Sequence, residues 1–310
     1  MRLSESDPNS NFSVYYMPAE VFSVGLYCYS RQKSVILYSI MRKKILYLTD
    51  LYYRAKGRNY FEEDLWLTGR LKDHFDVALC HPFNSESFEK DVDLIVFRNT
   101  GGVSGFKEVY DAFVKRVKAL HLKTFNEFTG KADMKGKQYL LDLTAAGYPV
   151  IPTVDKKEDI GQLPDVPKYV IKPKDGADSI GLEFLTREAL GGRELEPGLT
   201  LIQPMIDFQY ELSFYFINDK FEYALYAPDK SKRWALEKYV ATEEDIAFAT
   251  EFIRWNNIRS GIQRIDACRT KDGKLLLVEL EDLNPYLSIL EVDEPTRERF
   301  VKDWIEALNE

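Results

Sequence analysis

Residues 41–124 alternate short apolar runs with amphipathic stretches. Apolar runs of strand length occupy Ile45–Thr49, Phe75–Cys80 and Leu94–Phe97, and Tyr60–Leu71, between the first two, has the character of a helix. Strand and helix in alternation favour a small parallel sheet covered by helices. Phe106–Leu120 then carries apolar residues at intervals of three and four, which predicts an amphipathic helix.

Beyond residue 125 the pattern shifts towards strands and hairpins. A helix is predicted at Gln138–Ala146, because Gly147 and Pro149 follow it as usual C-terminal signals. A second helix, Glu243–Trp255, begins after Thr242, a candidate N-cap. Strands are predicted between these helices at Tyr169–Lys172, Leu182–Leu185, Leu199–Gln203, Leu212–Ile217 and Phe221–Tyr226.

The segment RIDACRTKDGKLLLVELE predicts a hairpin in which charged residues meet. Asp272-Gly273 favours a two-residue type I′ turn, which pairs Lys271 with Lys274. Counting down this ladder, and alternating faces, places two opposed pairs on one face: Asp266 with Glu279, and Arg264 with Glu281. The same count adds Cys268, Leu275 and Leu277 to that face and puts Ile265, Ala267, Leu276, Val278 and Leu280 on the other.

Directly opposed carboxylates destabilise a strand pair unless something compensates for their repulsion. A divalent cation would do so, since Mg²⁺ binds carboxylate oxygens together with phosphate oxygens. The residues alone leave a second interpretation open. Arg264 could pair with Glu281 beside a tolerated repulsion between Asp266 and Glu279 on a wet surface.

A second informative stretch is KYVIKPKDGADSIGLEFL. Lys172 ends an apolar strand, and an inward lysine is costly unless it meets an anion. Gly176 and Gly181 allow backbone N–H groups to approach phosphate oxygens closely, so the loop Asp175–Gly181 could close over a triphosphate. A hairpin connection with an exposed lysine is the alternative.

Composition narrows the class of protein. With 310 residues, 45% of them hydrophobic, the chain is long enough for two or three subdomains. Its net charge of −8 argues against binding nucleic acid or an anionic membrane. Three widely spaced cysteines suit reduced thiols, which predicts a cytoplasmic location. The three histidines form no zinc motif.

The first forty residues differ from the rest. They are polar at the start and then aromatic without a clear period, and they lack the features of a signal peptide or membrane span. We interpret residues 1–40 as an extension outside the catalytic fold, with MRKKILYLTD as the beginning of the first domain. A packed additional hairpin is the alternative.

An ordered series of segments from about Asn126 to Ile289 resembles the ATP-grasp superfamily, specifically ligases of the D-alanine–D-alanine ligase and glutathione synthetase type. The segments are DMKGKQYLLDLTAAGYPVIPT, YVIKPKDGADSIG, LIQPMIDFQYELSF, and RID followed by VELEDLNP. The resemblance implies an α/β (α+β) protein in which two α+β lobes hold ATP, preceded by a small Rossmann-like parallel-sheet domain. It implies domains at 41–124 and 125–310, the latter with a lid at about 156–203 and a metal-binding lobe at about 204–310.

The resemblance also implies roles in nucleotide binding. Lys135, or alternatively Lys137, would be the first nucleotide lysine and Lys172 the second. Gln203 would lie beside the adenine amino group, and Glu211 would hold the ribose. The remaining implied nucleotide contacts are Gly176, Ser179 and Gly181 in the lid, and the backbone of Met205 and Ile206 at the hinge.

At the metal end, Asp266 and Glu279 would hold Mg²⁺, or Mn²⁺ in its place. The family commonly has Glu-x-Asn here, whereas this chain has Glu-Leu-Glu, so either Glu281 or Asn284 would be the third ligand. Arg264 would contact the transferred phosphate or the acyl intermediate, and Arg264 and Lys172 would act in catalysis.

The implied activity is ATP-dependent activation of a carboxylate as an acyl phosphate, which an amine or another nucleophile attacks. The carboxylate would belong to an amino acid, a peptide or a small metabolite. Two loops are candidates for binding it, one with Arg54, Lys56 and Arg58 and one with Arg98 and Asn99. A non-catalytic ATP-binding module and a small-molecule kinase are the alternatives, and a homodimer stays open.

Overall fold

The computed structural model describes residues 27–30, 33–36 and 42–310, apart from 56, 100–101, 176–180, 197 and 233–234. The chain divides into two units, Met1–Met41 and Arg42–Glu310. In the first unit the described residues form an antiparallel hairpin of β1 (Tyr27–Ser30) and β2 (Lys33–Ile36). The remaining elements belong to the second unit, which carries the candidate site.

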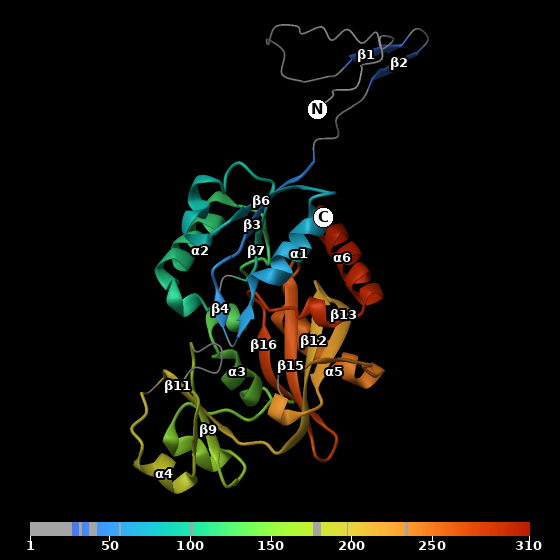
Figure 1. The fold of residues 1–310 in the computed structure, drawn as a ribbon. Helices are drawn as coiled ribbons and strands as arrows, with labels where there is room; N and C mark the ends of the chain where they lie inside the picture. The colour runs from blue at the N-terminus through green and yellow to red at the C-terminus, as the bar shows by residue number, and fades with distance from the viewer. Residues whose placement is uncertain are drawn as a thin grey trace, which may run out of the picture. The chain divides into compact units, whose positions relative to one another are not determined.

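A four-stranded parallel sheet of order β6-β3-β7-β8 begins the second unit (Figure 1). The predicted parallel sheet is therefore confirmed. The apolar runs of the central strands β3 and β7 are buried because helices cover both faces, whereas the edge strand β6 is partly exposed. The strands are β3 (Lys44–Leu48), β6 (Asp76–Cys80), β7 (Leu94–Phe97) and β8 (Thr124–Phe125).

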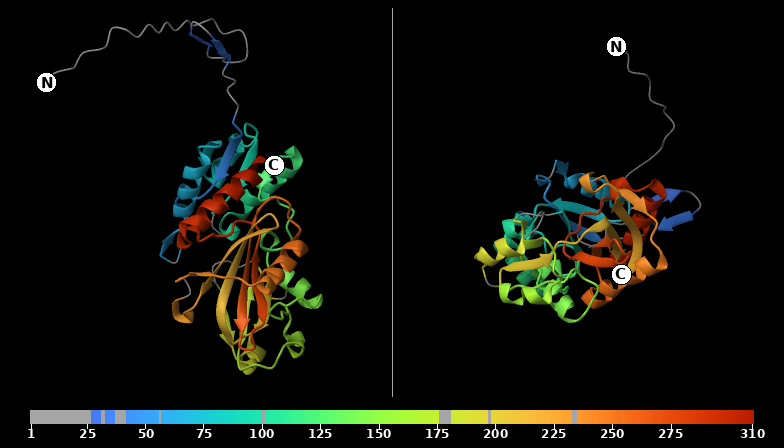
Figure 2. Two further views of the ribbon diagram at one scale, coloured as in Figure 1. Left: turned by 90° about the vertical axis from the view of Figure 1, so that its right-hand side faces the viewer. Right: turned by 90° about the horizontal axis from the view of Figure 1, so that it is seen from below.

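Three helices pack on this sheet: α1 (Phe61–Leu71), α2 (Lys107–Leu120) and α6 (Glu294–Asn309). Alternate residues of β3 face opposite sides, so Tyr47 packs with the α6 side and Leu46 with Phe113 of α2. Helices α1 and α6 lie side by side on the same face (Figures 1 and 2). The last element of the chain thus returns to the first sheet.

Helix α6 was not predicted, because Glu243–Trp255 was taken as the final helix. The signals for α6 are nevertheless present. Asp293 is its N-cap and accepts a hydrogen bond from the Thr296 backbone N–H at 2.9 Å. Its buried residues Phe300, Trp304 and Leu308 recur every fourth position.

The second unit also contains a five-stranded antiparallel sheet of order β14-β13-β12-β15-β16. The strands are β12 (Phe208–Ile217), β13 (Lys220–Ala227), β14 (Glu237–Tyr239), β15 (Ile262–Thr270) and β16 (Leu275–Glu281). Helices α3 (Tyr139–Ala145) and α5 (Glu243–Asn256) share a core with it. The N-cap prediction is confirmed, because the Thr242 side chain accepts a hydrogen bond from the Asp245 backbone N–H at 3.2 Å.

A smaller three-stranded sheet of order β10-β9-β11 completes the fold with helix α4 (Arg187–Gly192). Its strands are β9 (Tyr169–Pro173), β10 (Glu183–Leu185) and β11 (Thr200–Pro204). A short pair, β4 (Arg54–Ala55) with β5 (Arg58–Asn59), precedes α1. The parallel sheet and the two antiparallel sheets therefore give the mixed α/β architecture that was expected.

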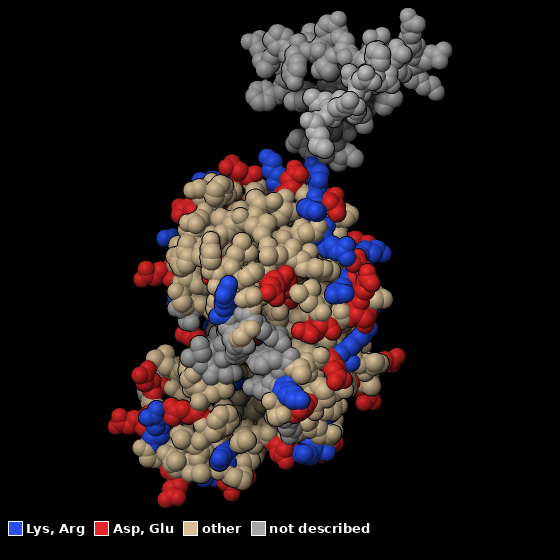
Figure 3. Space-filling view, viewed as in Figure 1, with Lys and Arg blue, Asp and Glu red and all other residues tan. Residues whose placement is uncertain are grey.

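The surface of the described residues mixes both signs of charge. On the face drawn in Figure 3, lysines and arginines alternate with aspartates and glutamates, without a broad basic patch among the coloured residues. Within the described ranges, no helix has the length and apolar content required to cross a membrane.

Candidate active site

Strands β15 and β16 bring three acidic side chains together. Asp266 lies opposite Glu279, and Arg264 opposite Glu281, which confirms the predicted register. One carboxylate oxygen each from Asp266, Glu279 and Glu281 lies within 4.8 Å of the others. These three residues are called the carboxylate cluster below.

The hairpin reaches this register by a different route from the one predicted. The turn holds three residues, since the Thr270 N–H donates to the Lys274 carbonyl oxygen at 2.8 Å, so the expected pairing of Lys271 with Lys274 is wrong. A bulge between Asp266 and Ala267 leaves Val278 without an opposed residue. The extra residue cancels the one-residue shift of the turn, so the carboxylates still meet.

The bulge also changes which apolar residues share a face. Leu275 and Leu277 pack in the core with Ile265 and Leu280, and they were wrongly assigned to the face of the carboxylates. A one-residue slip reverses every side chain beyond it. The prediction for β16 therefore holds only on the site side of the bulge, whereas Ala267 of β15 packs with Ile265 and Leu280 as predicted.

Arg264 partly neutralises the carboxylate cluster. Its Nη2 lies 2.8 Å from Asp266 Oδ2 and 2.5 Å from Glu281 Oε1, and Ser213 Oγ donates to Asp266 Oδ1 at 2.7 Å. Burial raises the pKa of Glu281 well above its usual value despite Arg264, and Asp266 and Glu279 raise it further.

Two lysines approach the cluster from other elements. Lys137 is buried and forms an ion pair with Glu279. Burial opposes the ionisation of Glu279, but Lys137 and Lys172 outweigh it and lower the pKa of this carboxyl. Burial lowers the pKa of Lys172 to about 8, an effect that Glu279 opposes and Lys137 strengthens. The carboxylate cluster is therefore surrounded by cationic side chains.

A cavity of about 530 Å³ opens beside the cluster. Its size suits a small-molecule ligand. Predicted residues that line it are Asn99, Lys135, Glu211, Arg264, Asp266, Glu279, Glu281 and Asn284, and three tyrosines, Tyr53, Tyr60 and Tyr286, add an aromatic wall. The cavity thus joins the carboxylate cluster to residues of the parallel-sheet lobe.

Comparison of the fold with solved structures finds three informative matches. D-cycloserine synthetase DcsG is 20% identical, with 86% of this chain and 99% of that chain covered at a TM-score of 0.64. D-alanine–D-alanine ligase from Bacillus anthracis, solved with ATP, is 12% identical, with 86% of this chain and 98% of that chain covered at a TM-score of 0.62. ATP-grasp ligase PsnB, solved with a precursor variant, Mg and ADP, is 14% identical, with 86% of this chain and 98% of that chain covered at a TM-score of 0.58.

The chain has the ATP-grasp fold. No protein-family model matches the sequence, and no curated protein matches it either. At such low identities the likeness extends to the arrangement of the backbone, so the roles of individual residues in this chain are argued from their own geometry.

The first nucleotide lysine was expected to be Lys135, with Lys137 as the alternative, and this choice stays a prediction. Lys135 lines the cavity but is exposed, whereas Lys137 is 6% exposed and contacts the cluster. Gly136, between them, has a φ of +79°, and a Cβ there would lie 2.6 Å from Asp175 Oδ1. This left-handed residue turns successive side chains in different directions.

The residues expected to form the hinge, Gln203, Met205 and Ile206, are not among those that line the cavity. Gln203 is buried and donates a hydrogen bond from Nε2 to Thr153 Oγ1 at 2.8 Å. The Met205 backbone N–H donates to the Lys168 carbonyl at 3.0 Å. The adenine contacts predicted for Gln203, Met205 and Ile206 stay predictions, as does the ribose contact of Glu211. Gly176 and Ser179 lie outside the described residues, whereas Gly181 is described and has a φ of +77°.

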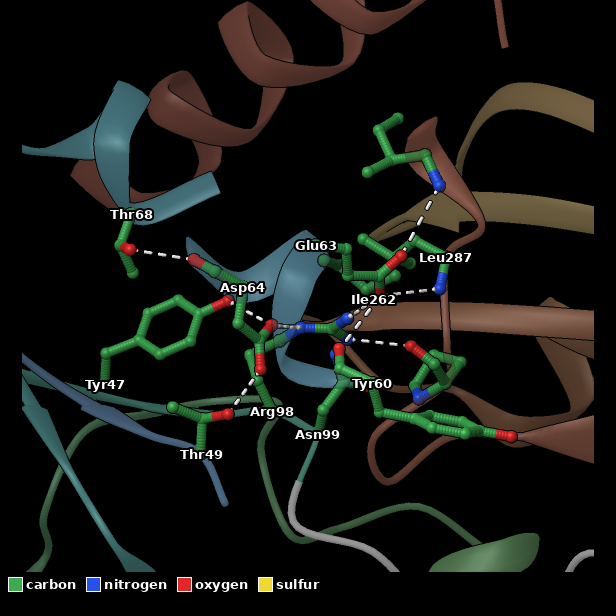
Figure 4. A network of polar contacts seen from close by, with 12 residues as sticks. Tyr47, Thr49, Tyr60, Glu63, Asp64, Thr68, Arg98, Asn99, Ile262 and Leu287 are labelled. Carbon is green, nitrogen blue, oxygen red and sulfur yellow. Dashed lines mark hydrogen bonds and ion pairs between the residues drawn. The ribbon is translucent and has the colours of Figure 1, made fainter. Parts of the chain in front are cut away.

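The substrate-binding candidates separate into two groups. Asn99 lines the cavity, while Arg54 is exposed in β4 and the side chain of Arg58 lies outside the description, as does Lys56. Arg98 is only 1% exposed and pairs inside the protein with Glu63 at 3.0 Å (Figure 4). The expectation that Arg98 faces a ligand from a loop is therefore corrected.

Sequence reasoning missed Asp282, which follows the cluster directly. This completely buried carboxylate accepts hydrogen bonds from the backbone N–H groups of Ala132 and Met134, at 3.0 and 2.8 Å. It thereby fixes the turn that carries the two candidate lysines. The missed neighbour Asp133 lines the cavity, and burial together with Glu279 raises its pKa to about 7. The available signal was an acidic residue that directly follows β16, the strand carrying Glu279 and Glu281.

Proposed function

We propose that this protein is an ATP- and Mg²⁺-dependent ligase that activates a carboxylate as an acyl phosphate for attack by an amine or another nucleophile. The observation that carries the proposal is the carboxylate cluster, which borders a cavity and is surrounded by Arg264, Lys137 and Lys172. Three acidic oxygens with nearby cations match a site for a metal-bound polyphosphate.

The residues present fit a divalent cation. Hard cations such as Mg²⁺ and Mn²⁺ prefer carboxylate oxygens, and the three cluster residues supply one each within 4.8 Å. When bound, the ion would neutralise phosphate charge during transfer. Both Glu281 and Asn284 line the cavity. Glu281 is the preferred third ligand because it also belongs to the carboxylate cluster.

The chain's own groups then act by charge and position. We assign Lys137 and Lys172 to the phosphates of ATP and Arg264 to the transferred phosphoryl group or the acyl phosphate. Phosphoryl transfer is promoted mainly by alignment and electrostatic stabilisation, so it needs no protein nucleophile. Arg264 is well placed for this role because its Nη1 donates to the Tyr286 carbonyl at 2.9 Å, which orients its other nitrogens towards the cluster.

The substrate is assigned to the part of the cavity lined by Asn99 and the tyrosines. The similar structures include a small-molecule synthetase, an amino-acid ligase and a ligase bound to a peptide precursor. We therefore propose an amino acid, a peptide or a small metabolite as the carboxylate, and an amine or other nucleophile as its acceptor. Nucleic acid is not among the proposed partners, in keeping with the net charge of −8.

The test is product release from MgATP with a panel of carboxylates and amines. We expect one pair of substrates to cause equal release of ADP and phosphate, with the joined product seen by mass spectrometry. Glu279→Gln should reduce this turnover by about 100-fold or more, whereas Glu251→Gln, which changes an exposed helical carboxylate, should not.

Other outcomes would contradict the ligase proposal. MgATP binding without turnover across the whole panel would favour a regulatory ATP-binding module. ADP release with the phosphate retained on the product would favour a small-molecule kinase.

A further inference from the structure

The parallel-sheet lobe contains a buried ion-pair network that the proposed chemistry does not use. Arg98 Nη2 lies 3.0 Å from Glu63 Oε1 and its Nε lies 3.7 Å from Asp64 Oδ1, and all three side chains are at most 1% exposed. Figure 4 shows the guanidinium of Arg98 between the two carboxylates. Burying a charge pair is costly, so its net contribution to stability is small.

Glu63 and Asp64, the two buried acidic residues of α1, have different partners. Asp64 accepts hydrogen bonds from Tyr47 Oη at 2.7 Å and Thr49 Oγ1 at 2.5 Å, both within the parallel-sheet lobe (Figure 4). Glu63 instead accepts from the Leu287 backbone N–H at 2.9 Å and the Ile289 backbone N–H at 3.4 Å. Glu63 thus reaches out of its own lobe.

Arg98 reaches the same segment. Its Nη1 donates to the Pro285 carbonyl oxygen at 2.9 Å. Residues 285–289, called the closing loop here, are separated from the end of β16 by residues 282–284, and Tyr286 and Ser288 of this loop line the cavity. The ring of Tyr286 lies 4.8 Å from the ring of Tyr60 at the start of α1.

The closing loop is also held from the opposite side. Arg264, which binds Asp266 and Glu281, donates to the Tyr286 carbonyl at 2.9 Å. An uninterrupted set of contacts therefore runs from Glu63 and Arg98 through the loop backbone to the carboxylate cluster. The contacts are with backbone atoms, so they fix the position of the loop irrespective of its side chains.

We infer that Glu63 and Arg98 are positioning residues that fix the closing loop, and with it the Tyr60–Tyr286 wall, against the carboxylate cluster. The inference rests on the proposed ligase function only in treating this wall as the substrate side of the cavity. Backbone hydrogen bonds to a buried, rigid ion pair are a means of holding a loop within the small tolerance that catalysis requires.

The test compares Glu63→Gln with a matched control. Glu89 pairs with Arg116 at 2.8 Å in the same lobe, and its carboxylate is also buried, but neither residue lines the cavity. In wild type, Glu63→Gln and Glu89→Gln, amide hydrogen exchange is measured in the presence of Mg²⁺ and ADP. We expect exchange at Leu287 and Ile289 to accelerate about tenfold or more in Glu63→Gln only.

A purely structural role predicts a different result. Faster exchange spread over β3 and β7 of the lobe, without preference for residues 285–289, would overturn the inference, as would unchanged exchange in Glu63→Gln. If Glu63→Gln does not fold, Arg98→Lys serves instead, because lysine keeps the charge but lacks the planar fork that spans Glu63 and Pro285.

A kinetic measurement separates this inference from the ligase proposal. With a substrate found in the panel, Glu63→Gln should raise KM for that substrate about fivefold or more while the Kd of MgADP changes less than about twofold. Equal effects in Glu63→Gln and Glu89→Gln would contradict the positioning role. The exchange experiment needs no turnover, so it reads the closing loop even if no ligase substrate is found.

Discussion

At the residue scale, the charged side chains of the hairpin could be placed from sequence and the lysines could not. Strand alternation puts Arg264 and Asp266 on one face, and Glu279 lies opposite Asp266 as predicted because the bulge offsets the error in the predicted turn. The surroundings of Lys135 and Lys137 depend on a left-handed glycine and on hydrogen bonds that Asp282 accepts from the backbone of a distant turn. Such long-range contacts leave no periodic signal in the sequence.

The two lysines give a prediction at this scale. Lys137→Ala should weaken MgADP binding about tenfold or more, because it removes a buried charge from the phosphate site. Lys135→Ala should change it less than about threefold, since this side chain is exposed. Calorimetric titration of both variants with MgADP decides which lysine binds the phosphates. A larger loss of MgADP affinity in Lys135→Ala than in Lys137→Ala would assign this role to Lys135.

At the element scale, most strands and helices follow from local pattern, and the differences have local causes. The hairpin turn is one residue longer than predicted, and the bulge at Val278 compensates for it. A Gly at position 273 with a φ of +87° suits more than one turn type, so the dipeptide Asp272-Gly273 did not settle the loop length. Helix α6 was not predicted, although the sequence contains both its N-cap residue and its apolar stripe.

The contact between β13 and α6 gives a prediction about pH. Burial raises the pKa of Glu222 to about 8, and Asp303 of α6 adds to the shift, while Lys220 and Arg299 oppose it. A carboxyl group with a raised folded-state pKa stabilises the fold when protonated, and this contribution is lost as the pH rises towards 8.

Glu222→Gln removes that titration. Relative to wild type, the variant should therefore have a larger free energy of unfolding, and so be more stable, at pH 8.5 than at pH 6, by about 1–3 kcal/mol. Urea unfolding of both proteins at the two pH values measures this difference, in which all other titrating groups cancel. The same difference at pH 6 and pH 8.5 would show that Glu222 is already ionised in the folded protein.

At the scale of the whole molecule, the ATP-grasp fold could be recognised from the order of four segments, and the structural comparisons confirm it. What local pattern could not show is that residues from both ends of Arg42–Glu310 build one cavity. Tyr60 and Asn99 of the parallel-sheet lobe meet Arg264 and Tyr286 there because α6 and the closing loop return to the first sheet. The proposed domain limits, including an extension at residues 1–40, stay predictions.

The central claim is that the carboxylate cluster binds a divalent ion bridged to a nucleotide. Its most direct test is calorimetric titration with AMPPNP, with Mg²⁺ or with EDTA, of wild type, Glu279→Gln and the exposed control Glu251→Gln. The account predicts Mg²⁺-dependent binding in wild type and Glu251→Gln, and at least about tenfold weaker binding with little Mg²⁺ dependence in Glu279→Gln. Equally tight, equally Mg²⁺-dependent binding by Glu279→Gln would contradict it.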